Sequence, residues 1–165
     1  MVKCLFMLCP TDFIEHIIRQ RFDGHKYFYT SLGNTFNIEK NNVNDLIKVV
    51  QKYAIEEITF ILSEDNKIIL DATQGQKFIG IRGFKNNYQK INEKRKMTHQ
   101  MWLSHDHHIL FLSYFLTDKI NKFREHLSNH AMPKLKVSAK IYSKAYDSFR
   151  AIYPEVSLSD LVRIN

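Results

Sequence analysis

The sequence has few of the residues that mark specialised protein classes. Only two of its 165 residues are cysteine, and glycine and proline together number eight. So few cysteines exclude a disulfide-rich secreted scaffold, and so little glycine and proline exclude a collagen-like or low-complexity chain. Apolar residues make up 44% of the chain and charged residues 25%, which is typical of an ordinary globular domain with a sizeable core.

Long hydrophobic runs are missing as well. No apolar run approaches the ~20 residues that a membrane-spanning helix needs. The N-terminus is apolar, but it lacks the basic stretch and the small-residue cleavage site of a signal peptide. We therefore expect one domain over residues 1–165, located in the cytoplasm and without a membrane partner.

Positive charge is in excess, with a net charge of +7 when histidine is neutral. This charge permits nucleic acid as a partner but does not establish it. The densest basic segment, KNNYQKINEKRK at 85–96, places a tyrosine among its cations, which suits phosphate contact and base stacking. No RNA-binding motif accompanies it, so we expect a solvated helix or loop, with weak non-specific nucleic-acid binding as an alternative. The candidate basic patch is Lys85, Lys90, Lys94, Arg95 and Lys96.

The first 75 residues alternate between strand and helix patterns. Three apolar runs at 2–9, 26–32 and 57–62 predict strands, and each is followed by a helical pattern. We expect Thr11 or Asp12 to cap the first helix, with Glu15 in a capping-box position, and Asn41 or Asn42 to cap the second. A short helix is predicted over NKIILDATQ at 66–74. Such alternation predicts an α/β fold with a mostly parallel central sheet flanked by helices.

The second half is less regular. KFIGIRGF at 77–84 fits a short strand or an irregular connection, and residues 97–127 fit one long helix or a helix pair. LKVSAKIY at 135–142 alternates apolar and polar residues, which predicts a half-exposed strand near a sheet edge. SFRAIY at 148–153 is predicted to pair back on it, and Ser157 or Ser159 to begin a C-terminal helix. The sheet should therefore contain four to five strands.

The order of these elements resembles the β-class carbonic anhydrases. That family opens with a buried strand ending in Cys-x-Asp-x-Arg, then has a strand ending in Arg-Asn-Ala-Gly-Asn, then one ending in Gly-His-x-x-Cys-Gly. Here FMLCPTDF, FYTSLGNTFN and ITFILSEDNKII stand in the three places. The segment from residue 120 to 152 also resembles the end of the family, so the resemblance covers most of residues 2–152 as pattern and order.

The zinc ligands of that family are mostly absent. Cys9 matches the first ligand, but Ser63 stands at the ligand histidine and Asn66 at the second ligand cysteine. A catalytic zinc site needs about three protein ligands of the histidine, cysteine or carboxylate type, and serine and asparagine are poor ligands for zinc. The family's aspartate and arginine are replaced by Thr11 and Phe13, with Asp12 one position away. The resemblance therefore implies a homologue without the metal.

The expected function is that of a non-catalytic carbonic-anhydrase-like protein, a pseudoenzyme with a binding or interaction role and no cofactor. The alternative is a cytosolic enzyme with a rebuilt pocket around Cys9, Asp12, Ser63 and Glu64. In open α/β sheets, ligands collect beyond the carboxyl ends of the strands. The candidate pocket at that edge is Cys9, Asp12, Asn34, Ser63, Glu64 and Asn66.

Two further kinds of site are considered, a reactive thiol at Cys9 and a histidine metal site. A helix N-terminus can activate a thiol, but no arginine or glycine-rich phosphate loop follows Cys9, so we expect a buried packing residue. His105 and His108 share a helix face and, with Asp106 or His99, could form a metal site, but no partner ligands can be identified. A polar turn is the expectation there.

Self-association is the last expectation. Proteins of the family that this chain resembles are usually built from two chains. The aromatic strand KYFYTSL and the apolar stretch ILFLSYFL at 109–116 suggest more hydrophobic surface than one small domain covers. A two-fold dimer is the commonest way to cover such a surface, so we expect a homodimer.

Overall fold

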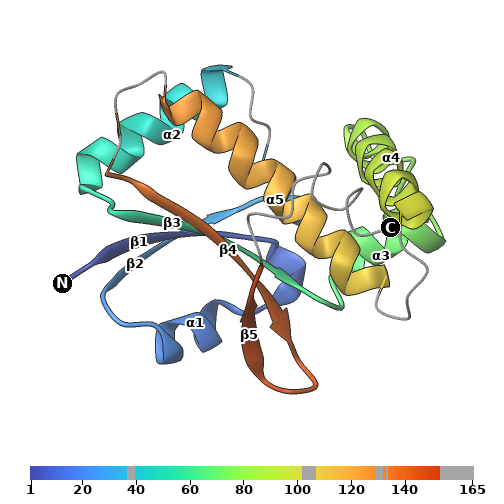
Figure 1. Cartoon of the computed structure of the whole chain (residues 1–165), viewed down its shortest axis with the longest axis horizontal. Helices are drawn as coiled ribbons and strands as arrows, with labels where there is room; N and C mark the ends of the chain where they lie inside the picture. The colour runs from blue at the N-terminus through green and yellow to red at the C-terminus, as the bar shows by residue number, and fades with distance from the viewer. Residues whose placement is uncertain (37–39, 102–106, 129–131, 133, 153–165) are drawn as a thin grey trace.

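A computed structural model describes residues 1–36, 40–101, 107–128, 132 and 134–152. Its centre is a five-stranded sheet in the order β2-β1-β3-β4-β5 (Figure 1). The strands are β1 (Lys3–Leu8), β2 (His25–Thr30), β3 (Glu57–Ser63), β4 (Lys136–Ser143) and β5 (Ser148–Ala151). The first four are parallel, and β5 runs antiparallel to β4. The mostly parallel sheet of four to five strands is thus confirmed.

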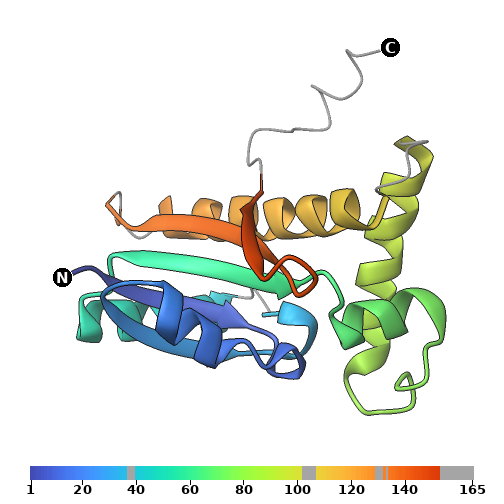
Figure 2. The same cartoon turned by 90° about the horizontal axis from the view of Figure 1, so that it is seen from below.

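Helices cover both faces of the sheet. One face, which carries the larger core cluster, packs against α2 (Lys40–Tyr53), α3 (Lys67–Gln74), α4 (Phe84–Met101) and α5 (His107–Ser128). The other face packs against the short helix α1 (Glu15–Arg21) (Figures 1 and 2). Covered on both faces, β1 and β3 are almost entirely buried, which explains their continuous apolar sequences.

The two cysteines belong to different sides of the sheet. Cys4 lies in the cluster beneath α1, whereas Cys9 lies in the larger cluster beneath α2 to α5. Both are buried and free. They lie on opposite faces of the sheet and are therefore not placed to pair with each other.

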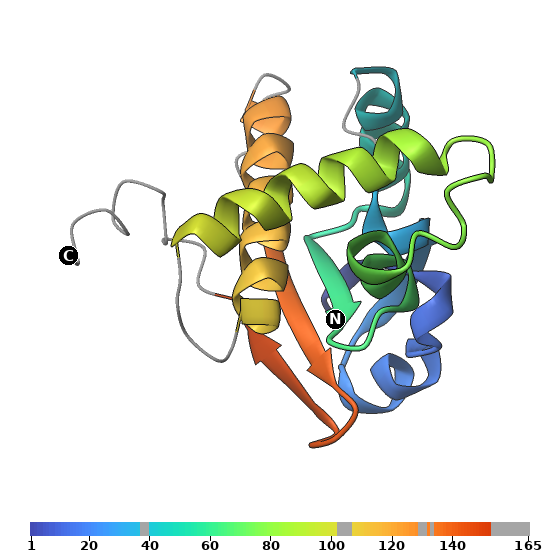
Figure 3. The same ribbon diagram turned by 90° about the vertical axis from the view of Figure 1, so that its right-hand side faces the viewer.

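The long apolar helix α5 supplies much of the large core. Its buried side chains recur every three or four residues, as expected of a helix that lies along a sheet; they are Phe111, Leu112, Phe115, Leu116, Ile120, Phe123 and Leu127. Figure 3 shows α4 lying across α5, and the two helices are in contact. No helix in the described ranges is long and apolar enough to cross a membrane.

The predicted starts of the first two helices were wrong, whereas the short helix predicted over 66–74 begins as expected, with Asn66 as its cap. A 3₁₀ turn, η1 (Pro10–Asp12), follows β1, Phe13 adopts a left-handed conformation (φ 54°), and α1 begins only after Ile14. Asp12 therefore caps no helix, because its carboxylate is used elsewhere in the fold. Likewise α2 already includes Lys40, so Asn41 and Asn42 lie inside the helix rather than at its cap.

Other expectations are settled in part. Residues 97–127 form parts of a helix pair, and residues 77–83 are an irregular connection. The basic segment is helical but not wholly solvated, because Tyr88 and Ile91 are buried. β4 lies next to the edge strand β5, which agrees with the prediction of a strand near a sheet edge, and β2 forms the opposite edge. The helix predicted from Ser157 or Ser159 falls outside the described residues.

Candidate functional site

The carboxyl ends of β1, β2 and β3 lie at the same edge of the sheet. β1 leads into Cys9 and the turn η1, β2 leads into a second 3₁₀ turn, η2 (Leu32–Asn34), and β3 ends at Ser63. The two turns contact each other and α3. The structure thus brings most of the candidate pocket residues to the edge where ligands bind in open α/β sheets.

Asp12 is the centre of a buried hydrogen-bond cluster. Its Oδ2 accepts a hydrogen bond from the backbone N–H of Ser63 (2.9 Å), and its Oδ1 accepts one from Nδ2 of Asn66 (2.6 Å). The residue is only 3% exposed. Burial raises the pKa of the Asp12 carboxyl to about 6, although the two hydrogen bonds favour the ionised form. The carboxylate thereby ties the turn after β1 to the end of β3.

Asn66 has both ends of its side-chain amide engaged. While Nδ2 donates to Asp12, Oδ1 accepts from the backbone N–H of Ile69 (2.9 Å) and so caps the N-terminus of α3. Asparagine is among the best residues for this position, because its short side chain satisfies an N–H that the helix leaves unpaired. The residue that the sequence resemblance matches to the second ligand cysteine therefore has a structural task in this chain.

Cys9 is held within the protein interior. Its Sγ accepts a hydrogen bond from the backbone N–H of Gly33 (3.1 Å) and lies 3.0 Å from Oγ1 of Thr11. Gly33 has a positive φ of 61°, and a Cβ at this position would approach Cγ2 of Ile68 to 2.9 Å. Glycine is therefore required for the chain to pass this close to α3.

The side chain of Asn34 links β1 and β3. Its Nδ2 donates to the backbone carbonyls of Met7 (2.9 Å) and Ile61 (3.0 Å), which belong to β1 and β3. Its buried Oδ1 has no hydrogen-bond partner within the described part of the chain. The role of this asparagine is to fasten η2 to the two central strands.

Ser63 and Glu64 turn away from the Asp12 cluster. The hydroxyl of Ser63 donates to Asp65. The carboxylate of Glu64 accepts from the hydroxyl of Ser143 (2.5 Å), and the backbone oxygen of Glu64 lies 2.6 Å from Nε2 of His108. The six candidate residues are therefore neighbours on one edge, but their side chains are hydrogen-bonded to different parts of the scaffold.

These residues do not fit a zinc ion. Among the described residues, no group of three or more histidine, cysteine, aspartate or glutamate side chains could hold a metal. Among the candidate residues at the strand ends, Cys9 is the only thiol, the carboxylate of Asp12 is engaged by two donors, and that of Glu64 accepts a hydrogen bond from Ser143. Of the proposed histidine site, His108 contacts a backbone oxygen, whereas His105 and Asp106 lie outside the described residues.

Comparisons with known proteins agree on the architecture. No protein-family model and no curated protein matches the sequence. Among solved structures, the β-carbonic anhydrase CafA of Aspergillus fumigatus matches with a TM-score of 0.73 at 12% identity, over 98% of this chain and 80% of that chain. The Coccomyxa β-carbonic anhydrase in complex with acetazolamide matches with a TM-score of 0.72 at 12% identity, over 96% and 76%.

The chain has the fold of the β-carbonic anhydrases. At this identity, the likeness establishes the carbonic-anhydrase-like fold and not the activity. It confirms the resemblance that the order of strands and helices indicated. The likeness does not test the role of any candidate pocket residue.

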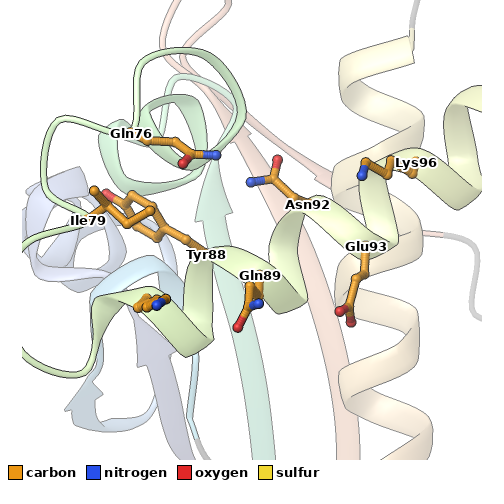
Figure 4. A pocket seen from close by; sticks show the side chains of 8 residues that line it. Gln76, Ile79, Tyr88, Gln89, Asn92, Glu93 and Lys96 are labelled. Carbon is orange, nitrogen blue, oxygen red and sulfur yellow. The ribbon is translucent and has the colours of Figure 1, made fainter.

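The basic patch predicted at 85–96 is not one surface. Lys85 and Lys96 line a hollow of about 210 Å³ beside α3, together with Gln76, Ile79, Tyr88, Gln89, Asn92 and Glu93 (Figure 4). Lys90 and Lys94 instead line a groove between α4 and α5, and Arg95 donates to the backbone oxygen of Thr73. Because the cations point to different sides of α4, they do not form the continuous strip that a nucleic-acid backbone requires.

A further charged residue of interest is Lys119 on α5, whose burial cannot be recognised from the sequence. Its side chain is only 9% exposed and lines the groove between α4 and α5. Its position between Asp118 and Ile120 could have placed it next to the apolar stripe of α5, but nothing in the sequence shows that α4 covers it. The groove therefore becomes visible only in three dimensions.

Proposed function

We propose that this protein is a non-catalytic member of the carbonic-anhydrase-like fold, with a binding role and no zinc. The observation that carries the proposal is the engagement of Asn66. Its amide bonds to Asp12 on one side and to the start of α3 on the other, so the position that would need a thiolate is part of the scaffold. Restoring the metal would require a different residue there.

Zinc titration of the purified chain tests this proposal. We expect the wild-type protein to retain no stoichiometric zinc after dialysis. A double variant, Ser63→His with Asn66→Cys, would supply the missing imidazole and thiolate beside Cys9 and is the matched positive control. About one equivalent of tightly bound zinc in the wild-type protein, lost in Cys9→Ala, would contradict the proposal.

A second candidate function, that of an enzyme with a rebuilt pocket, is favoured by Asp12 alone. A buried carboxyl with a raised pKa at the carboxyl ends of parallel strands is a common feature of active sites. An enzyme that uses Asp12 would lose its activity in Asp12→Asn while keeping its fold. The hydrogen bonds to Ser63 and Asn66 favour the structural role, because they leave neither oxygen of Asp12 without a donor.

We also propose a homodimer, although for only one of the two reasons that the sequence suggests. The apolar stretch of α5 does not supply free surface, because its phenylalanines are buried in the core. The outer strand β2 does, since Tyr29, Leu32 and the neighbouring Tyr53 of α2 are exposed. A solved neighbour, from Sordaria macrospora, is a tetrameric β-carbonic anhydrase. Light scattering during gel filtration tests the dimer, and a mass near that of one chain across a dilution series would contradict it.

The remaining expectations about location and partners stay predictions. A cytoplasmic location would be tested by fractionation of the source cells. Nucleic-acid binding, if it occurs, should be weak, independent of sequence and steeply dependent on salt. The division of the basic residues of α4 between two sides of the helix supports that expectation.

A further inference from the structure

A groove of about 820 Å³ lies between α4 and α5, and Thr35 and Phe36, which follow η2, also line it (Figure 3 shows the two helices). Its floor is apolar, with the buried side chains of Phe36, Ile91 and Phe115. Its walls are polar and positively charged. Four lysines line it against two acidic residues; they are Lys90, Lys94, Lys119 and Lys122 against Glu93 and Asp118.

Lys94 and Lys122 share one acidic partner, Asp118. Asp118 forms an ion pair with Lys94, and its Oδ2 lies 3.1 Å from Nζ of Lys122. Burial alone would raise the pKa of Asp118, but the hydrogen bonds and charges of these two lysines lower it below its usual range. One carboxylate is thus divided between two ammonium groups, which leaves positive charge in excess.

Lys119 adds a buried ammonium group to this excess. Its Nζ lies 4.9 Å from the centre of the Phe115 ring, and no carboxylate of a described residue forms an ion pair with it. Burial and the neighbouring Lys94, Lys122 and Lys90 lower the pKa of the Lys119 amine to about 7, although Asp118 opposes this. A charged amine without an acidic partner is costly to bury, and a negatively charged ligand in the groove would supply that partner.

We propose that the groove between α4 and α5 binds a small molecule that carries a doubly charged phosphate group and an apolar part. With all four lysines protonated, the groove has an excess of two positive charges, which matches a phosphate dianion. A bound dianion would itself favour the protonated form of Lys119, and lysine is a common phosphate ligand. The apolar floor of Phe36, Ile91 and Phe115 would hold the rest of the molecule. The volume lies within the ~300–1,000 Å³ of small-molecule sites.

A small ligand fits better than a nucleic-acid strand. Phosphates of a polymer bind to exposed rows of lysine and arginine, whereas Lys119 is 9% exposed and sits over an aromatic ring. The lysines of the groove lie on α4 and α5, and none of its lining residues belongs to the six candidate pocket residues. The inference therefore goes beyond the proposed function and does not depend on the absence of zinc.

The test is calorimetric titration of the full chain with phenyl phosphate at neutral pH. This probe combines a phosphate group with an aromatic ring, and benzenesulfonate, which has the same ring but only one charge, is the control ligand. We expect saturable binding of one phenyl phosphate per chain and at least about tenfold weaker binding of benzenesulfonate, as the loss of one charge-assisted hydrogen bond predicts.

Two groove variants and one control variant locate the site. Lys119→Met keeps the length of the side chain and removes its charge, and it should weaken phenyl phosphate binding by at least about tenfold. Lys122→Met changes a half-exposed residue of the same groove and should weaken binding even if Lys119→Met does not fold. Lys48→Met removes an equal charge from the exposed face of α2 and should leave binding unchanged.

Three results would overturn the proposal. The first is no saturable binding of phenyl phosphate up to about 10 mM, a concentration that covers even weak specific sites. The second is equal weakening by Lys48→Met and by the groove variants. The third is binding of a single-stranded RNA that phenyl phosphate does not displace. Each result can be obtained whether or not the protein binds zinc, so the two proposals fail separately.

Discussion

The substitution Lys119→Met should change how the stability of the protein depends on pH. Lys119 is buried between α4 and α5, and the pKa of its amine falls to about 7 in the folded chain. In the unfolded chain the amine is solvated and has its ordinary value of 10.5. Methionine has nearly the same length and shape but no proton to lose, so the variant isolates the titration from the packing.

The sign and size of the effect follow from proton linkage. Between pH 7 and 10.5 the unfolded chain binds a proton that the folded chain lacks, so the free energy of unfolding rises with pH. A full proton difference contributes about 1.4 kcal/mol per pH unit. Over the range from pH 7 to about pH 9.5, Lys119 should therefore add up to about 3 kcal/mol to the stability of the wild type. Lys119→Met lacks this contribution. The difference in unfolding free energy between the variant and the wild type should therefore shift by that amount, in favour of the wild type, as the pH rises.

Urea unfolding at several pH values measures this difference directly. The wild type and Lys119→Met are compared at each pH, so the titration of cysteines and tyrosines cancels between them. Lys48→Met, at an exposed position of α2, should follow the wild type throughout. Parallel stability curves for the wild type and Lys119→Met would refute the burial of an unpaired amine in the groove.

Three further predictions concern the scaffold around the two sites, each measured by urea unfolding. Gly33→Ala should cost about 1–3 kcal/mol, because the new Cβ meets Ile68 at 2.9 Å and the backbone has a positive φ; a stability equal to that of the wild type would show that this approach is not tight. Tyr88→Phe should cost about 1–2 kcal/mol by removing the 2.6 Å hydrogen bond to Asp71, and no cost would mean that the bond is not formed in solution. Asp12→Ala should cost about 3 kcal/mol or more, because two buried donors lose their acceptor, and unchanged stability would assign Asp12 to a role other than scaffold.

The architecture could be predicted because its signals are local and periodic. The apolar runs of β1 and β3 and the helical stripe of α5 each follow from the burial of whole faces, and their order limits the fold to a few topologies. The α2 pattern also predicted its helix, although not its first residue. Helix starts were the least predictable feature, since Asp12 looks like a cap in the sequence but is needed at the end of β3.

The candidate site was predictable only as a neighbourhood. Cys9, Asn34 and Ser63 follow strands, and parallel strands end at one edge, so their proximity follows from topology. The direction of each side chain does not, and Glu64 turns towards β4 for a reason that only the contact with Ser143 reveals. The burial of Lys119 could not be predicted, because it depends on α4, a separate helix earlier in the chain whose packing against α5 has no signal in the sequence.

The most direct test of the central claim is carbon dioxide hydration by the full chain in the presence of added zinc. The sequence resemblance puts Asn66 at the position of the second ligand cysteine, and the amide of Asn66 is already bonded at both ends. The account therefore predicts a stopped-flow rate no higher than that of buffer with the same zinc. A zinc-dependent rate above that background, abolished by Cys9→Ala, would contradict it.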